Sequence, residues 1–191
     1  RVLVACGATA RWRPLLACPG GHLRPRTRVV TQEVVRVAVS CEDAAALAGM
    51  PCIVCKFGGA DFGEAESFDS CYLLPPVEYP GGGRPFLKIG HGAWFERELP
   101  GLEAAAAWSR GEGRAGERDS ATAAEALRAM LEELLPGLLA RCSEVVVDRC
   151  LWDTTPTRRP YIDALPGGLV GVCLGGNGFA AKSSDEIGRV A

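Results

Sequence analysis

The stretch that decides the fold is a β-branched run, Arg28-Val-Val-Thr-Gln-Glu-Val-Val-Arg-Val-Ala-Val39. Valine and threonine, with partial alternation of apolar and polar positions, are typical of a β-strand. Further strands are predicted at 51–57, 70–75 and 85–90, and a turn signal at 79–84 joins the last two. Successive strands with turns between them predict an antiparallel meander.

After these strands, the spacing of apolar residues becomes helical. Apolar side chains recur three and four residues apart at Leu127, Met130, Leu131, Leu134, Leu135 and Leu138, which predicts a helix packed on the sheet. Thr122 with Glu125 predicts a capping box at its start, and Pro136 limits its end. A short helix is expected at 42–48 and a short strand at 144–148. We expect connecting segments at 11–23 and 58–68, and a charged stretch at 96–119 with a flexible loop at 111–116.

The two ends of the chain carry apolar runs. Residues 2–8 predict a fully buried strand followed by a Gly7-Ala8 turn. Residues 170–174 predict a strand that runs into Gly175-Gly-Asn-Gly-Phe179 and then a helix. Backbone N–H groups of such a turn can approach a ligand closely, although a glycine-rich turn after a strand is commonly only a turn. Both ends are abrupt, so we expect an internal fragment of a longer protein.

Composition excludes several classes of function. Of the 191 residues, 48% are hydrophobic and 23% charged, with a net charge of −2, so we expect neither a nucleic-acid nor a membrane partner. Nine cysteines without a secretory signal fit reduced thiols and a cytoplasmic location, with a peroxisomal or other organelle left open. The pair Cys52 and Cys55 has no second such pair, and His22 and His91 are the only histidines. We therefore expect no metal site.

Several motifs follow one another in an order that resembles a known enzyme family. These are Phe86-Leu-Lys88-Ile-Gly90-His91, Cys150-Leu-Trp152-Asp-Thr-Thr-Pro156, Tyr161-Ile-Asp163, Gly175-Gly-Asn-Gly178-Phe179 and Lys182-Ser-Ser. Together they resemble the C-terminal part of the FAD-dependent amine and amino-acid oxidoreductases, nearest the monomeric sarcosine oxidase and N-methyltryptophan oxidase branch. The N-terminal GxGxxG half of that family is absent from this sequence.

The resemblance implies an α+β fold. It contains an antiparallel substrate-domain sheet with flanking helices, plus the C-terminal part of an FAD-binding α/β domain. Residues 1–10 would be a late strand of the FAD-binding domain, residues 11–142 the substrate domain, and residues 143–191 the return to the FAD-binding domain. It also implies oxidation of a C–N bond in an amine or N-methyl amino acid, with O2 reduced to hydrogen peroxide. The oligomeric state stays open.

For the cofactor, the resemblance implies contacts from Cys150 and from the turn Gly175, Gly176, Asn177, Gly178 and Phe179. Cys150 matches the cysteine that binds the flavin through sulfur in the sarcosine oxidase branch. Such a thiolate needs activation, which we expect from Arg149; a plain strand cysteine with non-covalent FAD is the alternative. Asn177 replaces a histidine of the family motif and loses its titratable ring.

For the reaction, the resemblance implies roles for Lys88, Trp152, His91 and Lys182. Alternation along the strand points Lys88 away from Leu87 and Ile89, and the matching family lysine promotes reaction with O2. Without the resemblance, Lys88 is a solvent-facing lysine. Trp152 would line the substrate pocket, with core packing as its alternative. His91 would contact substrate, and Lys182 is either a displaced carboxylate ligand or part of a solvated helix face.

Two other functions stay open at this point. One is a dehydrogenase of the same superfamily that passes electrons to a carrier instead of O2. The other is a non-catalytic binding module that retains the fold.

Overall fold

The computed structural model describes residues 2–12, 16–18, 21–56, 70–80, 83–92, 97–112 and 114–191. The chain divides into two compact units. The five-stranded unit comprises Gln32–Glu96 and Arg110–Cys150, and the glycine-turn unit comprises Arg1–Thr31, Arg97–Ser109 and Leu151–Ala191. The predicted loop at 58–68 lies outside the described residues.

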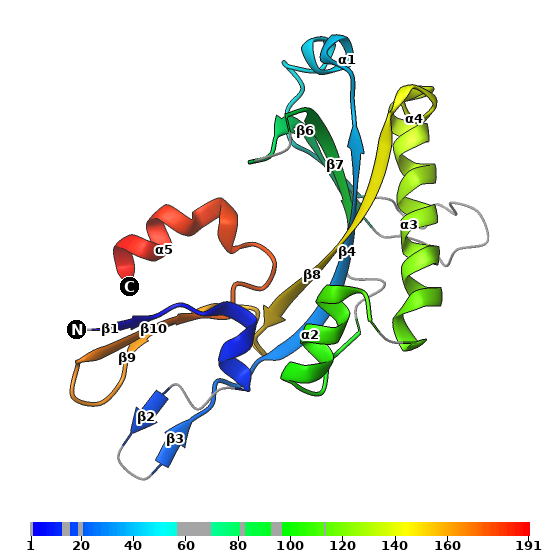
Figure 1. The fold of residues 1–191 in the computed structure, drawn as a ribbon. Coiled ribbons are helices and arrows are strands. Elements are labelled where there is room, and N and C mark those ends of the chain that lie inside the picture. Colours follow the sequence, from blue (N-terminus) through cyan, green and yellow to red (C-terminus); the bar gives the residue numbers. More distant parts are fainter. Residues whose placement is uncertain are drawn as a thin grey trace. The chain divides into compact units, whose positions relative to one another are not determined.

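The five-stranded sheet contains the predicted antiparallel strands, but only three of them follow one another as a meander, because the strand at 28–38 pairs with that at 85–91 and not with that at 53–56. Its order is β5-β6-β7-β4-β8. The strands are β4 (Arg28–Ala38), β5 (Ile53–Lys56), β6 (Ser70–Glu78), β7 (Pro85–His91) and β8 (Glu144–Thr154). β5, β6, β7 and β4 pair successively antiparallel, and β8 runs opposite to β4 (Figure 1). The register of β6 shifts between Leu74 and Val77, where two prolines lack the N–H group that a regular ladder uses.

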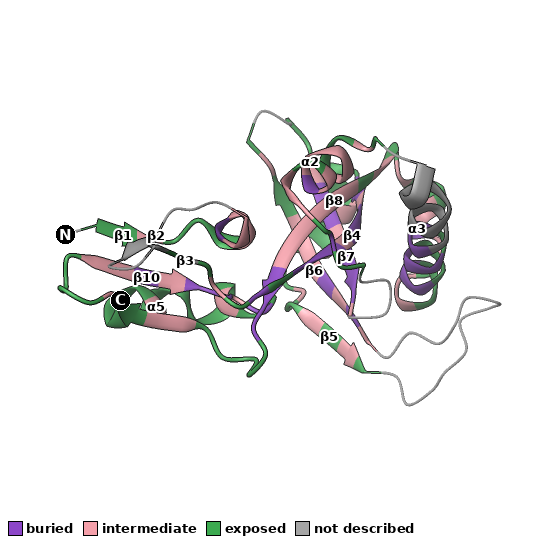
Figure 2. Cartoon of the chain, turned by 90° about the horizontal axis from the view of Figure 1, so that it is seen from below, coloured by how far each residue is buried: buried purple, intermediate pink, exposed green. Residues whose placement is uncertain are grey.

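One helix covers one face of this sheet. α3 (Arg114–Leu134) packs Leu127, Met130 and Leu131 against buried strand residues, among them Leu87 and Ile89. Its described buried positions lie toward the sheet (Figure 2). The helix thus confirms the predicted apolar stripe.

Two helix predictions are corrected, and one helix was not predicted. α3 begins at Arg114, so Thr122 lies inside the helix and the predicted capping box is wrong. The predicted flexible loop at 111–116 overlaps the first turn of α3, while residue 113 lies outside the described residues. α2 (Leu102–Arg110) occupies part of the charged stretch at 96–119, for which no helix was predicted; its run of alanines favours helix over the surrounding charges and glycines.

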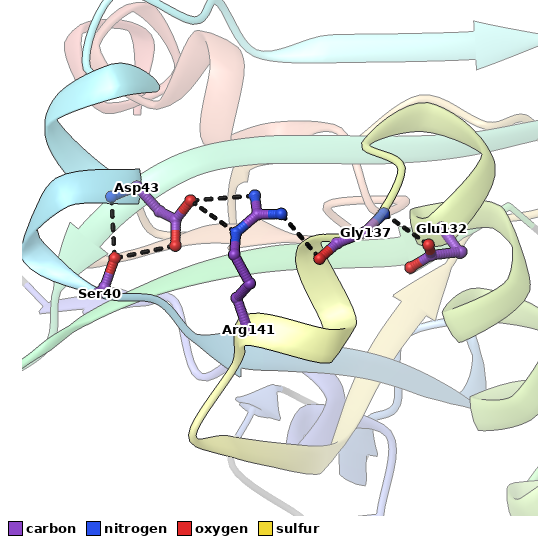
Figure 3. A network of polar contacts seen from close by, with 5 residues as sticks. All are labelled: Ser40, Asp43, Glu132, Gly137 and Arg141. Carbon is purple, nitrogen blue, oxygen red and sulfur yellow. Dashed lines mark hydrogen bonds and ion pairs between the residues drawn. The ribbon is translucent and has the colours of Figure 1, made fainter.

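A polar network joins the helix ends of the five-stranded unit (Figure 3). Asp43, in α1 (Cys41–Ala46), accepts a hydrogen bond at 3.1 Å from Arg141 in α4 (Leu138–Arg141). Ser40 caps α1 by accepting from the Asp43 N–H at 2.9 Å. The Gly137 carbonyl accepts from Arg141 at 2.9 Å, and its N–H donates to Glu132 at 2.5 Å. The turn after Pro136 is therefore tied at both polar atoms of Gly137.

The glycine-turn unit contains a smaller sheet. β1 (Val2–Val4) pairs parallel with β10 (Val170–Leu174), which pairs antiparallel with β9 (Tyr161–Ala164). The turn after β10 leads into η3 (Ala180–Ser183) and α5 (Ser184–Val190), as predicted. The segment predicted as connection at 11–23 contains the end of η1 (Gly7–Arg11) and the hairpin of β2 (Leu16–Cys18) and β3 (Gly21–Leu23).

The prediction of a fully buried strand at 2–8 is wrong. Val2 is 62% exposed and Leu3 is 50% exposed. Of β1, only Val4 packs against the small core of Ala10, Val172 and Leu174. Apolar character makes burial favourable, but burial also needs a covering element, and the described residues supply one only for Val4.

Among the described residues, no helix combines the length and apolar character needed to cross a membrane.

Candidate active site

Lys88 lies on the face of the five-stranded sheet that α3 does not cover. Leu87 and Ile89 are buried in the core cluster with α3, and side chains alternate along a strand, so Lys88 points to the opposite face. There the positive charge of Lys88 acts on the Cys150 thiol of β8 and lowers its pKa. The sheet order therefore brings together two residues that the sequence analysis predicted for one site.

The surroundings of Cys150 nevertheless favour the neutral thiol over the thiolate. Burial raises its pKa and is the largest influence, and Asp148 raises it further, against the opposing charges of Lys88 and Arg36. The expected activation of this thiol by Arg149 stays a prediction.

Tyr72 is a third residue of this face, and sequence reasoning missed it. Its pKa is raised to about 12, mainly by burial and to a lesser extent by the nearby Cys150 and Tyr79. Tyr72 lies opposite Gly90 in the register of β6 and β7, and a Cβ atom at Gly90 would collide with the phenol ring. The signal available in the sequence was this pairing: Gly90 is the small residue that lets a neighbouring aromatic ring lie against the strand.

Arg36 supplies a fixed positive charge on the same face. Its guanidinium donates to both carboxylate oxygens of Asp148, with Nη2 at 2.8 Å from Oδ1. It also lies 4.9 Å from the ring centroid of Tyr79 and 5.1 Å from that of Phe86. The hydrogen bond to Asp148 raises the pKa of Arg36, so this charge persists at every physiological pH.

His91 lies away from Lys88. It is 1% exposed, and it sits opposite Cys71, which belongs to the core cluster under α3. Its Nδ1 contacts the Gly92 carbonyl oxygen. Three positions separate His91 from Lys88, so alternation sends the two side chains to opposite faces. A substrate contact for His91 stays a prediction.

In the glycine-turn unit, a buried carboxylate organises the predicted turn. Asp153 is 7% exposed, and its two oxygens accept from the N–H of Gly175 at 3.0 Å and from the N–H of Gly176 at 3.2 Å. Its backbone carbonyl accepts from the Asn177 N–H at 3.0 Å. The N–H groups of Gly175 and Gly176 therefore already have an anionic partner within the chain.

Asn177 completes this arrangement from inside the turn. It is buried in the left-handed region, with φ 52°, which asparagine tolerates better than most residues. Its Oδ1 accepts from the Thr155 N–H at 2.8 Å, and its Nδ2 donates to the Gly175 carbonyl. Asn177 thus ties the turn to the end of β8. Sequence reasoning missed Asp153, whose position beside Trp152 was the available signal.

Trp152 packs against this turn. A Cβ atom at Gly178 would lie 2.8 Å from the indole ring, and φ at Gly178 is 71°. Both facts make glycine the fitting residue there. The indole Nε1 of Trp152 is buried and has no hydrogen-bond partner among the described residues. A buried unpaired donor is costly, so this N–H is available to an acceptor that the described residues do not provide.

The last predicted residues lie at the surface. Phe179 is 61% exposed, and the ammonium of Lys182 lies 5.5 Å from its ring centroid. Lys182 itself is exposed in η3. Within the part of the chain that the structure describes, no group of three or more His, Cys, Asp or Glu residues could hold a metal ion.

Comparisons with known proteins show which folds the chain resembles. No family model matches the chain, and no curated protein matches it. Among solved structures, fructosyl amine:oxygen oxidoreductase (amadoriase I) from Aspergillus fumigatus matches with TM-score 0.54 and 19% identity, over 86% of this chain and 34% of that chain. The chain shares its fold with part of these oxidases.

Two fructosyl peptide oxidases match nearly the whole chain. The enzyme from E. terrenum matches with TM-score 0.59 and 16% identity, and a modified enzyme from Aspergillus nidulans with TM-score 0.60 and 15% identity. Each match covers 99% of this chain and 40% of the other. The predicted resemblance to amine oxidoreductases is therefore confirmed at the level of the fold, and the chain spans well under half the length of the oxidases it matches.

Proposed function

We propose that this chain is the substrate-domain and C-terminal part of an FAD-dependent oxidoreductase that oxidises the C–N bond of an amine. The observation that carries the proposal is that Lys88 and Cys150 act on each other on the sheet face that α3 does not cover, in a fold shared with amine:oxygen oxidoreductases. When bound, FAD would supply the electron acceptor for the oxidation.

Observations in each unit fit such a cofactor. In the five-stranded unit, Cys150 offers a sulfur beside a lysine ammonium, and covalent attachment through this sulfur is part of the proposal. In the glycine-turn unit, the ring of Trp152 packs against Gly178, and its buried indole N–H has no partner among the described residues. We assign cofactor contacts to the turn from Gly175 to Phe179, with Asp153 holding its shape.

Lys88 would act on the second substrate, O2. Negative charge develops on oxygen as O2 accepts an electron, and a fixed cation on a partly buried sheet face stabilises that charge. The product under this proposal is hydrogen peroxide. The bland alternative, a solvent-facing lysine, predicts no effect of Lys88 on the reaction with O2.

The amine substrate would be a small molecule. Trp152 can offer one N–H donor and an apolar ring, which suits an amine with a modest polar part. The exposed position of Lys182 favours a solvated helix face over a carboxylate ligand. Because the matched structures are fructosyl amine and fructosyl peptide oxidases, we propose secondary amines as the class, with fructosyl amino acids and N-methyl amino acids as the two candidates to compare.

The deciding experiment measures the two half-reactions of the full-length flavoprotein by stopped flow. In Lys88→Met, oxidation by O2 is expected to slow by about 100-fold or more, while reduction by the amine changes much less. Lys88→Arg, which keeps the positive charge, is the matched control and should retain most of the O2 rate.

Other outcomes separate the alternatives. An unchanged O2 rate in Lys88→Met removes Lys88 from the site. A wild-type protein that is reduced by amines but reacts slowly with O2 is a dehydrogenase. A protein that binds no flavin and oxidises neither candidate amine is a binding module that kept the fold.

A further inference from the structure

Two cysteines lie side by side on the sheet face that α3 covers, away from Lys88. Cys55 of β5 is directly opposite Cys71 of β6 in the antiparallel register. Cys71 is buried in the core cluster, and Cys55 is partly buried against it. Both cysteines are free thiols, and the Cys55 side chain lies within hydrogen-bonding reach of the Cys71 thiol.

This placement suits a covalent link. Directly opposed residues of an antiparallel pair have Cα atoms about 4.5 or 5.5 Å apart, and disulfides accept about 4.4–6.8 Å. Because the pair is in register, the two Cβ atoms also leave the sheet on the same side. We propose that Cys55 and Cys71 form a redox-active dithiol that a peroxide closes into a cross-strand disulfide.

The two thiols have different surroundings, which sets the order of the steps. Cys55 lies on β5, at the edge of the sheet, and is only half-buried. Cys71 is 2% exposed, and burial raises its pKa to about 12. Cys55 is therefore the thiol that a dissolved peroxide reaches, and Cys71 is the resolving thiol.

The chemistry balances with hydrogen peroxide as the oxidant. The Cys55 sulfur attacks one peroxide oxygen, the O–O bond breaks, and Cys55 sulfenic acid and one water form. The Cys71 sulfur then attacks the Cys55 sulfur, the S–O bond breaks, and the proton of Cys71 leaves with the hydroxide as a second water. Two thiols are oxidised and one peroxide is reduced. The oxidant can come from any source, so this inference does not depend on the proposed function.

The neighbouring cysteine of the Cys52-Ile-Val-Cys55 motif is a poor competitor. Three residues of extended chain span about 10 Å, and disulfides do not bridge Cα atoms more than about 7 Å apart. Cys52 is also exposed, immediately before β5. It supplies a matched control: a cysteine close in sequence that should take no part.

The expected effect of closure is on the edge strand. β5 pairs only with β6 among the described strands, so its amides are held by one ladder. A disulfide between Cys55 and Cys71 ties the edge strand to the sheet interior. Hydrogen exchange of the β5 amides should then slow, and thermal stability should rise.

The test treats the purified protein with hydrogen peroxide, blocks remaining thiols with an alkylating reagent, and maps peptides by mass spectrometry. We expect a Cys55–Cys71 linked peptide that a dithiol reductant reverses, together with slower exchange in β5. Cys52→Ser should form the same link, and Cys55→Ser should form none. In Cys71→Ala, the Cys55 sulfenic acid loses its resolving partner and should be trapped by a dimedone probe.

Three results would overturn the proposal. These are a link between Cys55 and Cys52, direct conversion of wild-type Cys55 to sulfinic acid with Cys71 intact, and no reaction at either thiol at peroxide concentrations that oxidise the exposed Cys6 or Cys41. Cys55→Ser changes a half-buried residue on the edge strand, so we expect this variant to fold. It therefore tests the link even if Cys71→Ala, a substitution in the core, destabilises the protein.

Discussion

The two units of this chain are stabilised in different ways. The five-stranded unit has a large apolar core, in which residues of β4, β6 and β7 pack against α3. Among its described residues, the glycine-turn unit has a small cluster with three buried apolar residues, Ala10, Val172 and Leu174. Its turn is shaped instead by hydrogen bonds of Asp153 and Asn177. Apolar burial is non-directional, whereas a buried carboxylate fixes particular N–H groups.

This difference matters for the candidate site residues. Lys88 and Cys150 lie on strands of a sheet whose other face is packed, so they are held by a rigid support. The turn from Gly175 to Phe179 depends on a few polar contacts. Substitutions should therefore destabilise the five-stranded unit through lost apolar burial and the glycine-turn unit through lost hydrogen bonds.

The largest expected effect is a core truncation in the five-stranded unit. Leu127 is fully buried in α3, so Leu127→Ala should cost about 2–5 kcal/mol of unfolding free energy. Val172→Ala, in the small core of the glycine-turn unit, should cost about 1–2 kcal/mol, since it removes two methyl groups. Urea denaturation monitored by circular dichroism measures both. Equal losses would contradict the contrast between the two cores.

A smaller effect is expected from the carboxylate in the glycine-turn unit. Asp153→Ala leaves the N–H groups of Gly175 and Gly176 without an acceptor, and a buried unpaired group costs about 1–3 kcal/mol. Asp153→Asn keeps one side-chain oxygen and should lose less. Urea denaturation of both variants, with hydrogen exchange at the two glycine amides, separates them. Wild-type exchange at these amides in Asp153→Ala would show that the carboxylate does not hold the turn.

The smallest effect concerns the surface network of the five-stranded unit (Figure 3). The hydrogen bond from Arg141, and then that from Ser40, lowers the pKa of Asp43 below its ordinary value of 3.8. Because the folded-state pKa is depressed, the stabilisation is present above the unfolded pKa and is lost as pH falls through the folded pKa. In Arg141→Gln, NMR titration of Asp43 should give a higher pKa than in the wild type. An unchanged value would remove Arg141 as the main cause.

Local rules predicted the regular elements where the pattern was long. The β4 run, the apolar stripe of α3 and the strand before the glycine turn all form close to the predicted positions. The rules failed at Thr122, whose capping motif lies inside a helix that starts at Arg114. They failed also at Val2 and Leu3, which are apolar but exposed. Capping and burial both depend on neighbours that a local pattern does not contain.

The candidate site likewise contains residues that a local pattern could predict and residues whose partners lie far away in the sequence. Lys88 could be predicted because its strand alternates and because its motif resembles a family motif. Tyr72 was missed because its importance comes from Gly90 on the next strand and Cys150 on a distant one. Asp153 was missed because its partners, Gly175 and Gly176, come much later in the chain.

By itself, the sequence determined that Lys88 points away from Leu87 and Ile89, since alternation follows from the covalent geometry of an extended chain. It also determined that a turn follows the strand at 170–174, because glycine and asparagine tolerate backbone angles that other residues avoid. Only the tertiary structure decided that Lys88 acts on Cys150, that Cys71 lies opposite Cys55, and that Asp153 accepts hydrogen bonds from the N–H groups of the turn. Each of these contacts depends on strand order and register, which arise when distant segments bury their apolar faces together, and no local rule specifies them.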